Sequence, residues 1–392
     1  MRKIMVLSMC VCFASAQNEM DALLPFFGFE GSQSLQNRIG QATVTAGEII
    51  PGLTSNPANL GLHRFSTLGS NFYNGKFDGN RDLSNSGFSG LYAILPIHVY
   101  QGSLVFGFGI NKETSFSGAG INENYIPGVN DDYTFDVNGG MYITSFGAAI
   151  EFSKHLYIGV DFKYLRGENE LLKIYPNSAY PDSTDFFNAS YRGFGASIGF
   201  LQKYTPQFQI GGSLELPTKL WVDDRWIYSD NFDHLRSFNE LWEYTLKKPM
   251  VLHLGGTFNT KEFNLFYELE WTDFANIEFK SKTIFEEDLQ LPAEIGINNN
   301  IKSTFESTVA HHIGAAVHLP MFPMHLYGGY QYLPVPYTGD FDDDKRESIS
   351  AGFSFMLNQQ FSLHGSWTNY FWKNDGLKEN YSQSVFGVSL HY

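Results

Sequence analysis

The final segment of the chain, residues 381–392, has a strict two-residue hydrophobic period. Its apolar positions are Phe386, Val388, Leu390 and Tyr392, and the positions between them carry Gly387, Ser389 and His391. A period of two places alternate side chains on opposite faces of a β-strand. An apolar face that closes on an aromatic ring is typical of a transmembrane β-barrel, whose lipid-facing band is bordered by aromatic girdles. We therefore expect the apolar face to contact lipid, and Ser389 and His391 to face the lumen.

The same alternation recurs from about residue 64 onward. In 103–110 and 156–164, for example, large apolar residues alternate with Gly, Ser, Asp or Lys. The segments with this pattern are 64–77, 86–97, 101–112, 141–153, 154–168, 189–203, 204–218, 248–260, 261–277, 308–319, 323–333, 345–357, 359–372 and 381–392. They predict an all-β fold, a transmembrane antiparallel β-barrel of about 14 strands formed by residues 64–392. We expect the last segment to pair with the first and close the wall.

The connections between these segments alternate in length. Those after the even-numbered segments are tight, whereas several of the others are long, namely 113–140, 169–188, 219–247 and 278–307. Short turns on one rim and long loops on the other are typical of outer-membrane barrels. This parity predicts that both termini lie in the periplasm.

Residues 1–16 have the pattern of a secretory signal peptide: a positive start, an apolar run and an Ala-Ser-Ala end. Both cysteines, Cys10 and Cys12, fall within it, so we expect no disulfide and no thiolate metal site in the mature chain. No apolar stretch of about 18 residues follows, which excludes an ordinary helical membrane protein. Aromatic residues make up 16% of the chain and glycines number 38, which favours a barrel in a bacterial outer membrane.

The charge and the motifs exclude several functions. A net charge of −15 makes nucleic acid a poor partner. The Gly-Ala-Ser-Ile-Gly sequence at 195–199 matches a nucleophile elbow, but it lies within an alternating strand and not at the strand-turn-helix that this motif requires. We therefore expect no catalytic residues and no enzyme activity.

Metal and cofactor sites are not expected either. His311 and His312 are adjacent and would point to opposite faces of a strand. Three aspartates have the alternate spacing of a calcium loop, but the glycine and the glutamate of an EF-hand are missing. These aspartates are Asp340, Asp342 and Asp344. We interpret them as solvated turn residues, and a looser divalent-cation site is the alternative.

Residues 17–63 do not alternate, although 22–29 are rich in apolar residues. This apolar content disfavours a disordered periplasmic tail. We predict instead a plug, or hatch, inside the barrel, and Phe26, Phe27 and Phe29 are candidate ligand contacts.

The connection 219–247 is unusually apolar for a long outer loop. Its large apolar residues recur at spacings of three to four near its end, which predicts a short amphipathic helix. The candidate ligand contacts here are Trp221, Trp226, Phe232, Leu235, Phe238 and Trp242. Exposed apolar patches usually mark binding, so the loop could be a landing surface for an apolar substrate. The equally weighted alternative is that it packs on other loops.

Three stretches resemble the FadL-type outer-membrane transporters of hydrophobic compounds. The first is Ser-Asn-Pro-Ala-Asn-Leu at 55–60, which is similar to the Asn-Pro-Ala motif of the hatch in that family. The second is the strand pair 248–256 and 267–274, which ends in Trp-Thr-Asp-Phe. The third is the acidic turn followed by a glycine-containing strand at 342–352. Together they span most of the mature chain.

The resemblance implies that outer loops capture a hydrophobic ligand, such as a long-chain fatty acid or an aromatic hydrocarbon. The ligand would pass to a site in the lumen and leave sideways through a kinked strand, without a cofactor or a metal. Asn56, Pro57 and Ala58 would belong to the hatch, and Gly102, Gly107 and Gly109 would be candidates for the kink. We expect a monomer surrounded by outer-membrane lipid and lipopolysaccharide. The alternative is a barrel of similar fold that serves secretion or surface assembly and binds protein partners.

Overall fold

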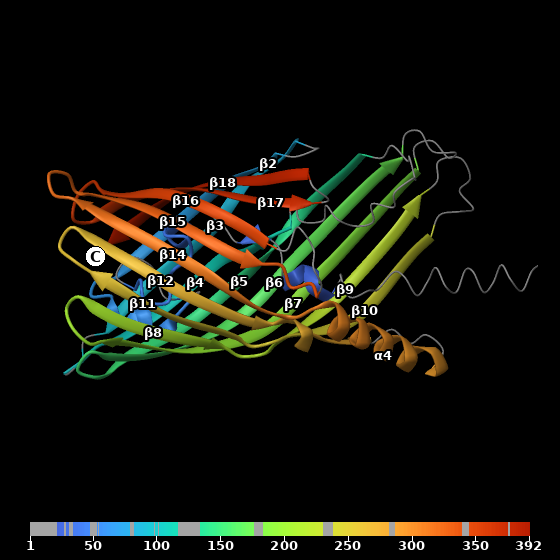
Figure 1. Cartoon of the computed structure of the whole chain (residues 1–392), viewed down its shortest axis with the longest axis horizontal. Helices are drawn as coiled ribbons and strands as arrows, with labels where there is room; N and C mark the ends of the chain where they lie inside the picture. Colours follow the sequence, from blue (N-terminus) through green and yellow to red (C-terminus); the bar gives the residue numbers. More distant parts are fainter. Residues whose placement is uncertain are drawn as a thin grey trace, which may run out of the picture.

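The chain forms one elongated barrel with the described part of residues 22–63 inside (Figure 1). The computed structural model describes residues 22–26, 29–30, 34–47, 53, 55–78, 82–97, 99–100, 102–116, 134–175, 183–229, 238–281, 287–338, 345–374 and 377–392. The predicted signal peptide lies outside these residues. None of the helices in this described part is long and apolar enough to span a membrane.

Fourteen antiparallel strands make up the described wall, as the sequence predicts. Eleven are single elements: β2 (Thr67–Asp78), β3 (Asp82–Ile97), β4 (Leu104–Ser115), β5 (Thr134–Ser153), β6 (Leu156–Tyr175), β7 (Ser183–Lys203), β14 (Ser307–Leu319), β15 (Met324–Pro334), β16 (Lys345–Met356), β17 (Phe361–Asn374) and β18 (Leu377–His391). Each of the other three is divided into two elements: β8 (Phe208–Glu215) with β9 (Thr218–Ser229), β11 (Val251–Asn259) with β10 (Phe238–Lys248), and β12 (Phe263–Asp273) with β13 (Glu278–Ser281).

The predicted closure between the last and the first strand is confirmed. β18 pairs with β2 in a continuous register from Asn380 opposite Asp78 to His391 opposite Thr67. Phe386 is 61% exposed on the outer face, whereas Ser389 is buried on the inner face. The alternation therefore has the expected physical cause, because the two faces of the strand meet different surroundings.

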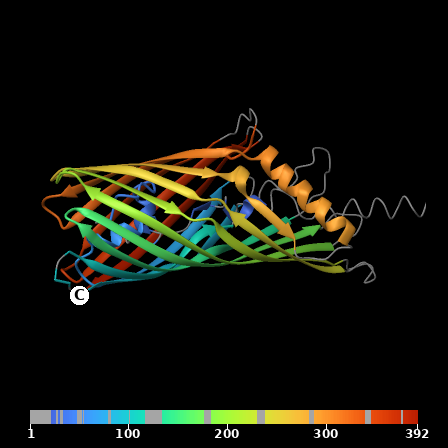
Figure 2. The same ribbon diagram turned by 90° about the horizontal axis from the view of Figure 1, so that it is seen from below.

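The two ends of the barrel differ. The C-terminus lies at the end with the short turns, which include 154–155, 204–207 and 260–262 (Figure 1). At the other end β5, β6 and β7 continue for 20 or 21 residues and, with β9 and β10, form a tall wall that we call the collar (Figure 2). Helix α4 (Glu287–Thr304) lies beside this end, in a segment that the sequence predicts as a loop.

The amphipathic helix predicted within 219–247 is wrong in the described part of that connection. Residues 218–229 and 238–248 are β9 and β10, which pair with each other from Thr218 opposite Lys248 to Tyr228 opposite Phe238. The inward side chains of β10 are Trp242, Tyr244 and Leu246, which repeat every two residues. Phe232 and Leu235 lie outside the described residues.

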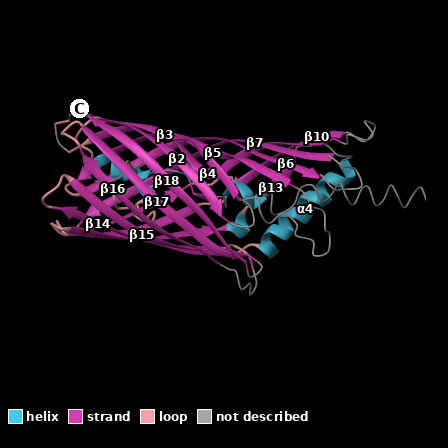
Figure 3. Ribbon diagram, turned by 90° about the horizontal axis from the view of Figure 1, so that it is seen from above, coloured by secondary structure: helices cyan, strands magenta, loops and turns pink. Residues whose placement is uncertain are grey.

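The N-terminal segment occupies the lumen as four short elements. These are η1 (Leu24–Phe26), β1 (Phe29–Glu30), α3 (Ser34–Asn37) and η2 (Pro57–Leu62) (Figure 3). β1 adds two residues to the inner side of β4, with Phe29 opposite Ser115. Residues 55–61 are all buried, and η2 packs against β5, β6 and β7.

Candidate functional site

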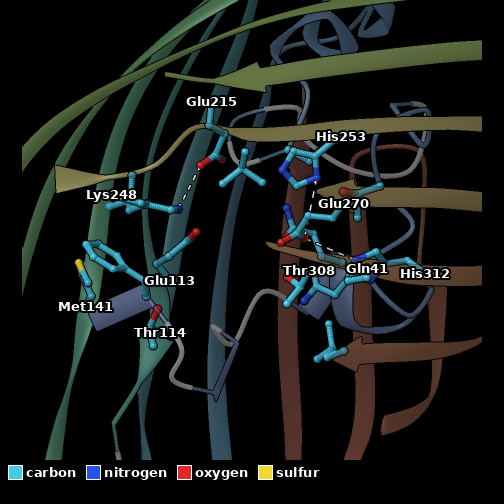
Figure 4. Close-up of a pocket in the computed structure, with 18 of the residues that line it drawn as sticks. Gln41, Glu113, Thr114, Met141, Glu215, Lys248, His253, Glu270, Thr308 and His312 are labelled. Carbon is cyan, nitrogen blue, oxygen red and sulfur yellow. Dashed lines mark hydrogen bonds and ion pairs between the residues drawn. The ribbon is translucent and has the colours of Figure 1, made fainter. Parts of the chain in front are cut away.

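A cavity of about 210 Å3 lies inside the barrel between two parts of the N-terminal segment. Pro25 and Phe26 border it on one side, and Gln36, Gln41 and Ser55 border it on the other. The barrel wall supplies the remaining lining from β4, β5, β6, β8, β10, β11, β12, β14, β15 and β16 and from the turn after β12 (Figure 4). The cavity is therefore lined by the wall and by the hatch together.

One part of the cavity lining is apolar. Met141, Ile143 and Leu165 project from the collar strands, and Phe274 comes from the 3-10 turn η4 (Phe274–Asn276). These four belong to a buried cluster that extends to Tyr191, Leu220, Tyr244 and Phe279. An apolar group at this end of the cavity would thus lie against an apolar core.

Another part of the lining carries charges that are paired. Glu215 accepts a hydrogen bond from Lys163 at 2.7 Å and one from Lys248 at 3.3 Å. Figure 4 shows the second of these contacts beside Glu113. The side chain of Lys163 is only 6% exposed, so its charge depends on this pairing.

Glu268 connects the wall to the hatch. Its Oε2 atom accepts hydrogen bonds from the backbone N–H groups of Thr43 at 2.6 Å and Val44 at 2.7 Å. Its Oε1 atom lies 2.9 Å from Nδ1 of His253. Because Glu268 is buried, these contacts hold the 43–44 turn of the hatch against β12.

Two further side chains, Glu270 and His312, also line the cavity beside Glu268 and His253. Glu270 Oε2 lies 3.5 Å from Nε2 of His312. Within the described part of the chain, no set of three or more His, Cys, Asp or Glu side chains is arranged to hold a metal ion. The predicted acidic turn, Asp340 to Asp344, lies outside the described residues.

Lys112 is a buried cation on the cavity wall. It is 2% exposed, and its Nζ donates a 2.7 Å hydrogen bond to the hydroxyl of Tyr73. The Nζ also lies 4.4 Å from the centroid of the Tyr73 ring. Among the described residues no carboxylate pairs with it, unlike Lys163 and Lys248. It can therefore offer its charge to an anionic group in the cavity.

Aromatic residues form a ladder on the inner face of the collar. The rings of Phe187 and Trp226 stack at 5.6 Å with an interplanar angle of 9°, and Trp226 lies 6.1 Å from Trp242. The indole N–H of Trp226 donates to Asp185 at 3.0 Å. We call Phe187, Trp226 and Trp242 the aromatic ladder. It leads from the collar towards the buried cluster that borders the cavity.

The other aromatic candidates occupy different places. Trp221 packs edge-on against Phe194, which is exposed on the outer face, with centroids 6.3 Å apart. Phe26 borders the cavity. Phe27 lies outside the described residues, and for Phe29 and Phe238 only the backbone is described. Of the predicted contacts, the structure thus brings together Trp226 and Trp242 and separates Trp221 from them.

The Asn-Pro-Ala sequence begins η2 in the hatch. The Asn56 side chain accepts a hydrogen bond from the N–H of Ala58 at 3.0 Å, which caps the turn, and Pro57 occupies its first position. Asn56 Nδ2 donates to the carbonyls of Val44 at 2.8 Å and Phe200 at 2.9 Å. One side chain therefore joins two parts of the hatch to strand β7.

The three glycines named for the strand kink lie in β4 or in the turn before it. β4 pairs with β3 and with β5 in continuous register through Gly107 and Gly109, and its register shift lies further on, between Lys112 and Thr114. A Cβ at Gly107 would lie 2.7 Å from Leu53 and 2.8 Å from Leu60 of the hatch. Gly102 has a φ of +76° in the turn before the strand. The missing side chain at Gly107 leaves room for the hatch residues Leu53 and Leu60, and Gly102 permits the positive φ of the turn.

Four inward-facing charged residues were not predicted as site residues from the sequence: Lys112, Lys163, Glu215 and Glu268. A usable signal was present, because each is a charged residue at an inward position of an alternating segment. A charge at such a position must meet a partner, water or a ligand.

Comparisons with known proteins give the same fold. No protein-family model matches the sequence, and no curated protein matches it significantly. Among solved structures, a Pseudomonas aeruginosa FadL homologue is 13% identical with a TM-score of 0.66, over 93% of this chain and 99% of that one.

Two further structures agree. The monoaromatic hydrocarbon channel CymD is 12% identical with a TM-score of 0.63, over 92% of this chain and 98% of that one. The Ralstonia pickettii toluene transporter TbuX is 13% identical with a TM-score of 0.62, over 94% of this chain and 99% of that one. The chain therefore has the fold of the FadL-type outer-membrane channels.

Proposed function

We propose that this protein carries hydrophobic molecules across the bacterial outer membrane, with both termini in the periplasm. The observation that carries the proposal is the cavity inside the barrel with an apolar end that continues towards the aromatic ladder. The related folds include proteins described as a monoaromatic hydrocarbon channel and a toluene transporter, which supports the same class of cargo. No covalent step is involved.

The path has three stages. The aromatic ladder captures the molecule at the collar, where stacking on rings needs no specific polar group. The cavity then holds it against Met141, Ile143 and Phe274. Movement of the hatch or of the wall releases it. Lipid and lipopolysaccharide surround the barrel, which works as a monomer.

Lys112 favours a cargo with an acidic group, such as a long-chain fatty acid. Within the described part of the chain the buried Lys112 ammonium has no carboxylate partner and donates to the Tyr73 hydroxyl, so a carboxylate beside it would be stabilised. The cavity, about 210 Å3, is smaller than the usual range for drug-sized ligands, so a long acyl chain requires the hatch to shift. A single aromatic ring is the second candidate cargo, since it would fit with a smaller change.

Equilibrium binding of a fluorescent fatty acid to the purified barrel tests the proposal. We expect saturable binding that unlabelled fatty acid reverses. Trp226→Ala should slow ligand capture roughly two- to tenfold, which corresponds to the stacking contribution of one ring. Trp221→Ala is the matched control, because it removes the same side chain from the opposite face of the same strand.

The opposing result is equally clear. If neither fatty acids nor alkyl-aromatics bind, and deletion of residues 22–30 changes no uptake, the transport proposal is wrong. Capture of a protein partner by the same barrel would then favour the surface-assembly alternative.

A further inference from the structure

The outer face of the collar changes from apolar to cationic at one height. On β6 the outward residues from Ile158 to Tyr164 are apolar or aromatic and exposed, and Arg166 is the first charge after them. On β7 the exposed Phe194 is followed, towards the collar rim, by Arg192. The change marks the upper edge of a band that faces lipid.

The height of this edge agrees with the thickness of a bilayer. Arg166 lies ten residues beyond Leu156, where β6 begins at the short turns. At about 3.3 Å per residue and a strand tilt of about 40°, this distance is roughly 25 Å along the barrel axis, and the apolar band of an outer-membrane barrel is also about 25 Å tall. The rings of Tyr164 and Phe194, with centroids 5.0 Å apart, lie where an aromatic girdle is expected.

Strand pairing brings five cations together along this edge. Arg166 of β6 lies directly opposite Arg192 of β7. Lys219 of β9 lies directly opposite Lys247 of β10. The fifth cation, Lys280, projects from β13, which pairs with β10. All five are exposed on the outer face, and we call them the cationic row.

Two pairs within the row place like charges opposite each other, which destabilises a strand pair. One member of each pair is compensated, because Arg192 contacts Asp223 at 2.6 Å and Lys247 contacts Glu278 at 3.0 Å. The other three members of the row have no carboxylate partner among the described residues. An anion beside the row would therefore reduce a repulsion and accept charge-assisted hydrogen bonds.

The composition of the chain does not account for the row. Acidic residues outnumber basic ones, 41 to 26. Apart from Glu278, the nearest outward acidic residues of these strands project one step further from the apolar band, at Glu168, Asp223 and Glu243. Cations therefore dominate the first charged layer above the hydrocarbon, which is where anionic lipid head groups are recognised.

Strand β2 gives a contrast at a comparable height. Lys76 lies nine residues beyond Thr67, where β2 begins, and is exposed on the outer face. It lies opposite Ser382 of β18 and Ser84 of β3. A lone cation between hydroxyl groups attracts an anion less strongly than several neighbouring cations do. The features that suit an anion thus lie on the collar side of the barrel.

We propose that the cationic row binds the phosphate groups of one lipopolysaccharide molecule at the foot of the collar. This inference rests on the proposed function, which puts the collar at the outer leaflet. Arg166 and Arg192 present planar guanidinium groups that bind phosphate through paired hydrogen bonds, and the lysines add point charges. The row extends over five neighbouring strands, about 19 Å at a spacing of about 4.8 Å, so it can contact more than one phosphate. The bound lipid holds the barrel at a fixed depth, with the aromatic ladder above it.

Native mass spectrometry of the purified barrel, with bisphosphorylated lipid A titrated in detergent, tests the proposal. We expect one tightly bound lipid A per parent barrel. Arg166→Gln and Lys219→Gln should each weaken this binding roughly three- to tenfold, and the double variant roughly 10- to 100-fold, because each removes a charge-assisted contact. Lys76→Gln is the matched control, since it removes one outward cation at a comparable height, and it should change the affinity less than about twofold.

Three other probes identify the recognised group. Lipid A without its phosphates should bind the parent barrel at least roughly tenfold more weakly and should bind the double variant no more weakly than the parent. Phosphatidylglycerol should bind more weakly than lipid A, and inorganic phosphate should not displace lipid A. Fatty-acid binding should be equal in all these variants, because the substituted side chains lie on the outer face.

Equal binding of lipid A by the parent and the double variant would overturn the proposal, and so would an equal loss in Lys76→Gln. Displacement by inorganic phosphate would indicate a small-anion site, and equal binding of phosphatidylglycerol would indicate an unselective basic surface. Either result overturns the assignment to lipopolysaccharide. A parent barrel that binds lipid A but neither binds nor transports fatty acid overturns the proposed function alone, so the two failures are distinguishable.

Discussion

Replacement of Asn56 by alanine should loosen the hatch without unfolding the barrel. The side chain is fully buried and makes three hydrogen bonds, to the N–H of Ala58 and to the carbonyls of Val44 and Phe200. A typical intramolecular hydrogen bond contributes about 1 kcal/mol net, and a buried carbonyl left without a partner costs more. The sum is about 3 kcal/mol, which corresponds to a roughly 100-fold larger population of the open hatch.

Native-state hydrogen exchange with peptide mass spectrometry measures this opening. In the parent barrel the amides of residues 41–63 should exchange slowly, and in Asn56→Ala they should exchange roughly 100-fold faster. The amides of β14 to β18 should not change, because those strands do not contact Asn56. Ligand release should become faster in the same proportion if hatch opening limits it.

Asn369→Ala is the matched control. Asn369 accepts a hydrogen bond from Ser382 at 2.6 Å within the wall, far from η2 along the chain. It tests whether loss of an asparagine hydrogen bond on the outer face of the wall also loosens the hatch. Exchange of 41–63 that changes less than twofold in Asn56→Ala, or that changes equally in the control, would refute the assignment of Asn56 as the main tie between hatch and wall.

Three further predictions concern the cavity and the hatch. Lys112→Met should weaken binding of a fatty acid roughly 10- to 100-fold and leave toluene binding unchanged, and equal effects on both ligands in competition assays would contradict the proposed carboxylate contact. Gly159→Ala should speed hydrogen exchange of the hatch amides, because the added Cβ would lie 2.4 Å from the backbone of Pro57. The control Gly328→Ala should not, because the nearest atom to its Cβ is 3.9 Å away. Hydrogen exchange of residues 55–62 measures both variants. Glu268→Gln should speed exchange of the Thr43 and Val44 amides about tenfold, and unchanged protection there would exclude a charge-dependent tie.

The sequence is sufficient to predict the wall wherever the alternation is continuous. β18 and β2 are examples, because a uniform outer face and a uniform inner face impose a period of two over their whole length. The predicted strand ends at residue 218 because the inward-pointing side chains change from odd-numbered to even-numbered residues between Glu215 and Thr218. A reversal removes the period from any window that includes it, so β9 and β10 read as an apolar loop.

Helix α4 was not predicted from the sequence, for a different reason. It contains Pro292 and Gly296, which disfavour a helix interior. Ile297, Ile301 and Phe305 nevertheless follow one another at four-residue spacing and join the buried cluster that borders the cavity. Packing on the wall thus outweighs the local preference, and a single sequence does not show which wall a helix packs on.

The candidate site was also predicted from the sequence only in part. The Asn-Pro-Ala sequence was sufficient to identify the hatch turn, since a capping side chain followed by proline is a local signal. The aromatic ladder was only partly predicted, because Phe187 lies on another strand and the pairing of β7 with β9 places it opposite Trp226. The pairing of strands, and not their composition, decides which rings meet.

The ligand specificity of the cavity depends on which of its buried charges are already paired within the protein. Lys248 pairs with Glu215, and His253 pairs with Glu268, which also binds the hatch amides. A charge that is already paired gains little from a ligand, because any new contact must replace one that exists. Among the described residues Lys112 has no carboxylate partner and donates to a neutral hydroxyl, so an anion beside it would replace none of the ion pairs described. The charge of Lys112 can therefore favour an acidic over a neutral cargo, and the Lys112→Met comparison of fatty acid with toluene tests that preference.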